Sequence, residues 1–222
     1  MGSEMCIRDS STTNRNLPWE SPSSREGGNM VRLGRLLQLE DNRDARLAGS
    51  LIHCCFEQID WLEDGPPHDA LLQDKLRNID GATQPDIKSA ISSFRKMLKR
   101  PNTSNLLQRE QFGSDLFNSY DDYEVQNERA FTVRVADAIL NGFIDRLVLL
   151  KRGGKIVAAD VVDFKTDALP ANDQTALRQR VDVYKPQIRG YRDAVAAIFG
   201  LPIEDVSARL MFVAIDQQVP IR

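Results

Sequence analysis

Two apolar runs of strand length, joined by a pair of glycines, are the feature of this sequence that most constrains its fold. Phe143–Leu150 and Lys155–Lys165 are rich in Val, Ile, Leu and Ala, as strands buried on both faces usually are. Gly153 and Gly154 stand between the runs and can adopt the positive φ angles of a tight hairpin. The sequence therefore predicts that the two runs pair as neighbouring strands.

Charged residues interrupt this predicted hairpin. Asp145 lies on the first strand, and Asp163 and Lys165 lie on the second. Because side chains alternate along a strand, Asp163 and Lys165 should share one face, and the hairpin should bring Asp145 within reach of Asp163. Neighbouring carboxylates repel each other unless a cation binds between them, and oxygen ligands favour Mg²⁺ or Mn²⁺ over zinc. An Asp-x-Lys triplet alone is common, and Gly-x-x-Asp-Arg also fits a strand with a surface ion pair. The metal site is therefore indicated only by the two motifs together, in this order and with a hairpin between them.

Composition indicates an ordinary soluble domain. The 222 residues carry a net charge of −3 and suit one domain with a tail, or at most two small domains. No apolar run is long enough to span a membrane, and the first residues lack a secretory signal. The three cysteines suit reduced thiols in the cytoplasm and are too few for an iron–sulfur cluster. This net charge gives no overall positive potential of the kind that would indicate binding to nucleic acid, although it is compatible with a local basic patch.

The chain divides into a leader and a domain. Residues 1–30 are dense in Ser, Asn, Arg and Gly, so we expect a disordered or non-native leader. We also expect that a longer parent protein has lost its front at this point. Residues 31–222 should form the domain, with a helical part at 42–100 and an α/β core at 123–216. Helical apolar stripes at 48–62 and 184–198 and strand patterns at 128–135 and 208–215 predict a mixed sheet flanked by helices, with a helical segment ahead of it.

Five short motifs occur in a fixed order along the chain. They are Gly49-x-x-x-His53, Glu128-x-x-Phe131, Gly142-x-x-Asp145-Arg146, Asp163-Phe164-Lys165-Thr166 and Gln187-x-x-x-Tyr191. This series resembles the RecB/AddA-type nuclease domain of the PD-(D/E)XK superfamily, usually found at the C-terminus of UvrD-like helicases. The resemblance covers about 44–215 and implies a restriction-endonuclease-like α/β fold. The family often has Tyr where Phe164 stands, a position that should face the core.

The resemblance implies a role for each matched residue. Asp145, Asp163 and Lys165 are the expected catalytic residues. His53 and the backbone carbonyl of Phe164 are the expected further ligands of the metal, which both aspartates would also bind. The implied residue near the metal is Glu128, and those in contact with DNA are Gln187, Tyr191 and Arg146.

Some of these residues also fit ordinary structural roles. His53 lies on the edge of a helical stripe, where a histidine is more often packed than liganding. Glu128 also fits a carboxylate at the edge of a strand. Tyr191 belongs to an apolar stripe and is compatible with the core.

The expected activity is therefore hydrolysis of DNA with Mg²⁺ or Mn²⁺, as exonuclease or endonuclease, in break processing or recombination. The expected substrate is single-stranded DNA or duplex ends, supplied by a helicase subunit or a missing helicase domain. The chain contains no Gly-x-x-x-x-Gly-Lys phosphate loop, so we expect no nucleotide cofactor and no motor of its own. The alternative is a catalytically silent DNA-binding or scaffolding module on the same fold.

Overall fold

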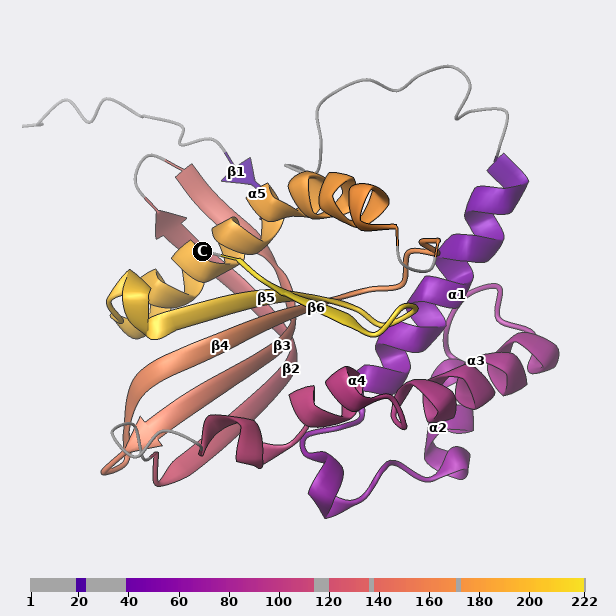
Figure 1. Cartoon of the computed structure of the whole chain (residues 1–222), viewed down its shortest axis with the longest axis horizontal. Helices are drawn as coiled ribbons and strands as arrows, with labels where there is room; N and C mark the ends of the chain where they lie inside the picture. Colours follow the sequence, from indigo (N-terminus) through magenta and orange to yellow (C-terminus); the bar gives the residue numbers. More distant parts are fainter. Residues whose placement is uncertain (1–18, 23–38, 114–119, 136–137, 171–172, 222) are drawn as a thin grey trace, which may run out of the picture.

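The computed structural model describes residues 19–22, 39–113, 120–135, 138–170 and 173–221, and a six-stranded sheet lies at its centre (Figure 1). The strands run in the order β1-β3-β4-β5-β6, and β2 pairs with β3. Most neighbours are antiparallel, but β1 is parallel to β3 and β5 is parallel to β4. The predicted mixed α/β fold is confirmed. The strands are β1 (Trp19–Glu20), β2 (Asp122–Val135), β3 (Ala138–Arg152), β4 (Lys155–Lys165), β5 (Val206–Phe212) and β6 (Gln217–Pro220).

The predicted hairpin is β3 and β4. Arg152 pairs with Lys155 around a turn in which Gly153 and Gly154 have φ angles of 57° and 73°. These left-handed conformations are ones that glycine adopts without strain. The turn glycines set the first pairs of the hairpin, and a bulge between Leu150 and Lys151 then shifts the register by one residue before the strands reach the charged residues.

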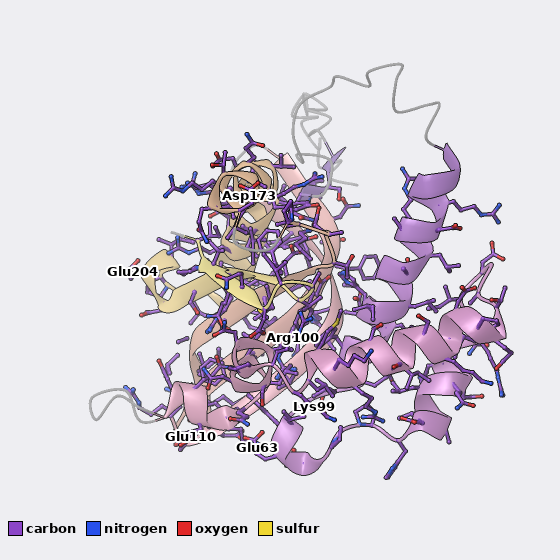
Figure 2. All side chains as sticks on the ribbon, turned by 45° about the vertical axis from the view of Figure 1, so that its right-hand side comes forward. Glu63, Lys99, Arg100, Glu110, Asp173 and Glu204 are labelled. Atoms are coloured by element: carbon purple, nitrogen blue, oxygen red, sulfur yellow. The ribbon has the colours of Figure 1, made fainter. Side chains whose placement is uncertain are left out.

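One long helix, α5 (Gln174–Phe199), covers one face of the sheet (Figure 1). It begins at Asp173, whose carboxylate accepts from the backbone N–H groups of Thr175 and Ala176. Figure 2 labels Asp173 at this helix end. The apolar stripe had indicated a helix only from Tyr184, because the first turns of α5 bury little besides Leu177.

The other face is covered by a group of helices whose apolar side chains form a second core with the sheet. Phe56 lies at its centre, stacked on Phe164 with ring centroids 4.4 Å apart. Arg100, labelled in Figure 2, ties this layer to the sheet by donating to the carbonyls of Val213 and Ala214. The helices are α1 (Leu39–Glu57), α2 (Asp69–Leu76), α3 (Gln84–Met97) and α4 (Pro101–Leu106), with short 3₁₀ turns at Leu62–Asp64, Arg109–Phe112 and Ile203–Asp205.

Part of the expected leader belongs to the sheet. β1 pairs with Ile139 and Leu140 of β3, so the expectation of disorder is wrong for residues 19–22. Pro22 packs there so closely that a β-carbon at Gly190 would lie 3.2 Å from it. A two-residue strand is too short to show an alternating pattern in sequence, which is why the prediction missed it. Residues 1–18 and 23–30 lie outside the described residues.

Within the part of the chain that the structure describes, none of the helices is both long enough and apolar enough to cross a membrane. Cys54 and Cys55 of α1 are free thiols.

Candidate metal centre

The alternation of side chains breaks at matched positions of β2 and β3. Ile144 and Leu147 both pack into the core under α5, so Asp145 and Arg146 both turn to the α1 face. On β2, Glu128 has a φ of +46° and lies opposite Asp145 in the register, between the pairs Asn127–Arg146 and Arg129–Ile144. A regular pair of strands would send consecutive side chains to opposite faces. The paired irregularity therefore gathers carboxylates on the side where α1 lies.

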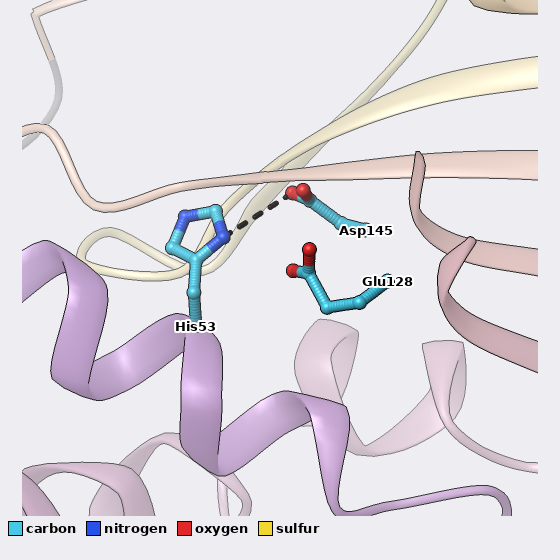
Figure 3. Close-up of side chains that lie close together, drawn as sticks. All are labelled: His53, Glu128 and Asp145. Carbon is cyan, nitrogen blue, oxygen red and sulfur yellow. Dashed lines mark ion pairs between the residues drawn. The ribbon is translucent and has the colours of Figure 1, made fainter. Parts of the chain in front are cut away.

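His53, Glu128 and Asp145 meet at this irregularity (Figure 3). One ligand atom from each lies within 4.8 Å of the others, and Nδ1 of His53 is 3.4 Å from Oδ2 of Asp145. An ion with ligands at about 2.0–2.6 Å spans two ligand atoms up to roughly 4–5 Å apart, so the three groups fit one divalent cation. Two carboxylates with one imidazole suit Mn²⁺ and also admit Mg²⁺.

Helix α1 brings His53 to the sheet by a close approach at Gly49. A β-carbon on Gly49 would lie 3.1 Å from the hydroxyl oxygen of Thr166, just beyond β4. One helical turn separates Gly49 from His53, so both lie on the helix face that meets the sheet. The absent side chain at Gly49 thus permits His53 to reach the carboxylates.

Asp163 belongs to a second group on the α5 side of β4. Its Oδ2 lies 2.9 Å from Nζ of Lys165, and this ammonium also donates to Gln187 at 2.9 Å. Gln187 in turn donates to the hydroxyl of Tyr191 at 3.1 Å. Among the described residues, the group that could hold a metal does not include Asp163. The charge of Asp145 nevertheless acts on Asp163 and helps to raise its pKa, so the two groups are neighbours and a shared metal stays a prediction.

Burial and mutual repulsion shape the charges of both groups. Burial, together with the charge of Asp145, raises the pKa of Glu128 to about 7. Burial also raises the pKa of Asp163 to about 7, against the opposing effect of Lys165. Burial acts to lower the pKa of His53, but the hydrogen bond and charge of Asp145 outweigh it and raise that pKa. A bound cation would offset the repulsion between carboxylates held this close together.

Arg146, which the sequence predicts to contact DNA, is fully buried. Its side chain donates to the carbonyls of Ile59 and Asp60, with its guanidinium over the ring of Trp61. The carbonyl of Ile59 also accepts a hydrogen bond from the amide of Asn127. This burial favours a structural role for Arg146 beneath the end of α1, and the DNA contact stays a prediction.

Gln187 and Tyr191 are also buried, each about 4% exposed. The burial favours a supporting role for both side chains, and their contact with DNA stays a prediction. Gln187 reaches the centre by accepting a hydrogen bond from Lys165. The ring of Tyr191 meets that of Phe131 edge to face, with centroids 5.8 Å apart. Gln187 holds the ammonium of Lys165, and Tyr191 holds the amide of Gln187. Neither side chain extends to the protein surface.

The motifs missed Tyr184, whose ring centroid lies 4.0 Å from Nζ of Lys165. It precedes Gln187 by three positions on α5, so helical spacing was a usable signal for it. The backbone of Phe164 also borders the centre, since its N–H donates to Asp145 at 2.8 Å.

A family model described as the PD-(D/E)XK nuclease superfamily matches residues 31–220. The matched range includes α1, both groups of the centre and every strand except β1. No curated protein matches the chain.

Proposed function

We propose that this chain, which belongs to the PD-(D/E)XK nuclease superfamily, is a deoxyribonuclease that depends on Mg²⁺ or Mn²⁺. Members of this superfamily are usually nucleases, which supports phosphodiester hydrolysis as the reaction. The observation that carries the proposal is the convergence of His53, Glu128 and Asp145 within 4.8 Å, together with the ion pair between Asp163 and the partly exposed Lys165.

His53, Glu128 and Asp145 are the proposed protein ligands, and Asp163 and the backbone carbonyl of Phe164 are the candidates to complete the set. A bound divalent cation supplies Lewis-acid chemistry, which activates water and offsets negative charge on the phosphate. Glu128 and Asp163 must lose their protons to bind the cation, so cation binding competes with protons at these two carboxyl groups, whose pKa values burial raises in the metal-free protein.

Lys165 is the proposed catalytic cation. Asp163 and Gln187 hold its ammonium from two sides, and the ring of Tyr184 covers it. A positive charge fixed in this way stabilises charge that develops on the phosphate oxygens and can orient the attacking water. The buried Gln187–Tyr191 pair supports that position from α5.

A role in DNA break processing or recombination, a cytoplasmic location and a partnership with a UvrD-like helicase follow only from the motifs and composition. These stay predictions. The alternative function, a silent DNA-binding or scaffolding module, would need none of the buried charges. Keeping Asp145, Asp163 and Lys165 at a sheet centre costs stability, which favours catalysis over a scaffold.

The test is cleavage of end-labelled single-stranded and duplex DNA with Mg²⁺, Mn²⁺ or EDTA. We expect metal-dependent cleavage by the wild type and none by Asp163→Asn or Lys165→Ala. Gln179→Ala, an exposed residue of α5, is the matched control and should cut like the wild type. Binding of DNA without cleavage by any of the proteins would favour the silent module.

A further inference from the structure

Phe143 is the most exposed of the large apolar side chains that the structure describes, at 60%. It lies on β3, two positions before Asp145, while the neighbouring Ile144 is buried under α5. Alternation therefore places the Phe143 ring on the same face of the sheet as Asp145. An exposed aromatic ring lies about 7 Å along the strand from a proposed metal ligand.

The β2 residues that lie nearest to this ring in the strand register are small and exposed. Ala130 lies directly opposite Phe143 on β2, and Thr132 lies opposite Asn141 one step further along. Ala130 and Thr132 are exposed, and Arg134 is exposed beyond them on the same face of β2. One side of the ring is thus bordered by a methyl group, which leaves space for a flat partner.

We propose that Phe143 stacks against a nucleobase of single-stranded DNA, in a nucleotide next to the phosphate that is cut. This inference rests on the proposed nuclease function and adds a substrate preference to it. The spacing of two strand residues matches the length of about one extended nucleotide, so a phosphate at the metal centre would bring an adjacent base to the ring. Arg134 lies further along this face, where it can attract the phosphates that follow.

The chemistry of the patch favours a base over a protein partner. A protein interface needs a broad apolar core, whereas Phe143 is a single ring among Ala, Thr and Asn. Base-on-aromatic stacking needs only one ring and tolerates any sequence. A base inside a duplex has both faces covered by its neighbours, so the ring selects single strands and frayed ends.

The experiment uses the full chain with Lys165→Ala, which blocks cleavage and keeps the proposed metal ligands. A single-stranded oligonucleotide with one 2-aminopurine beside the cleavage position is titrated in Mn²⁺. We expect Phe143 to quench the fluorescence of that base. Phe143→Ala should remove the quenching and weaken binding by about tenfold or more, and Phe143→Trp should restore both.

Leu71→Ala is the matched control, because Leu71 is an exposed apolar residue of α2, 44% exposed. It should change neither quenching nor affinity. Cleavage is then compared with Lys165 intact, where Phe143→Ala should lower kcat/KM on single strands and leave blunt duplexes nearly unchanged.

The results separate the two proposals. If the wild type cuts DNA and Phe143→Ala binds and cuts single strands equally well, the stacking inference is wrong and the nuclease function stands. If the wild type cuts nothing, the nuclease function fails, and the quenching by Phe143 alone decides the inference. A loss of self-association or partner binding with unchanged DNA binding would also overturn it.

Discussion

Oδ2 of Asp145 accepts a hydrogen bond of 2.8 Å from the backbone N–H of Phe164. The ladder between β3 and β4 ends one residue earlier, at the pair Arg146–Val162. The side chain of Asp145 therefore replaces the next backbone acceptor at the point where the strands separate. One carboxylate both holds the strands together and borders the proposed metal centre, so its two roles can be separated by substitution.

Asp145→Asn should abolish cleavage and leave the metal-free protein at least as stable as the wild type. Asparagine keeps an oxygen for Phe164 but removes a charge that repels Glu128 and Asp163. Asp145→Leu, equally uncharged, lacks the acceptor and should be less stable than Asp145→Asn by about 1–2 kcal/mol. Urea unfolding in EDTA measures the difference, and equal stabilities of the two variants would contradict the structural role.

Gln187→Ala should lower kcat by roughly tenfold or more while leaving the affinity for Mn²⁺ unchanged. The amide of Gln187 holds Lys165 and touches none of the three residues that could hold the metal. Steady-state kinetics with a parallel Mn²⁺ titration separates this result from a general loss of structure. Gln179→Ala on the same helix is the control, and an equal loss of activity there would show that the effect is not specific to Lys165.

Arg146→Ala should destabilise the fold by about 3 kcal/mol or more, because the carbonyls of Ile59 and Asp60 lose their charged donor. In a domain of this size the melting temperature should fall by roughly 6–12 °C. Arg178→Ala, at an exposed position of α5, should leave it unchanged. A stable Arg146→Ala protein with weakened DNA binding would instead support the contact that the sequence suggested.

The metal-free protein should lose stability as the pH rises. The pKa of Glu128 is raised from 4.5 to about 7, so between these values the folded state binds more protons than the unfolded state. Under that condition the free energy of unfolding falls with increasing pH. The raised pKa values of Asp163 and His53 act in the same direction.

Melting temperatures across this pH range, in EDTA and in Mn²⁺, measure the effect. Mn²⁺ binds the deprotonated groups, so its stabilisation should grow as the pH rises. Glu128→Gln should flatten the profile in EDTA. A profile that rises with pH in EDTA would contradict the assigned environment of these carboxyl groups.

The hairpin and the core position of Phe164 were predictable from the sequence, because both depend on local patterns. A continuous apolar run predicted β4 as a strand buried on both faces, and two glycines predicted the turn. Phe164 packs on Phe56, as its place between Asp163 and Lys165 indicated. Strand periodicity carries this information wherever the strand is regular.

The faces of the sheet on which Glu128, Asp145 and Arg146 lie were not predictable, because they depend on a backbone irregularity that the residue types do not reveal. A positive φ is uncommon for glutamate, so no pattern indicates it at Glu128. At the same break Arg146 lies inward, and Asp145 lies against His53. The sequence prediction for all three residues assumed regular strand alternation, which fails at this position.

Anomalous diffraction from crystals grown with Mn²⁺ tests the central claim most directly. We predict a manganese ion bound by a ring nitrogen of His53 and by carboxylate oxygens of Glu128 and Asp145, at about 2.0–2.3 Å. Manganese bound only elsewhere, or absent from this group at concentrations that support cleavage, would contradict the account.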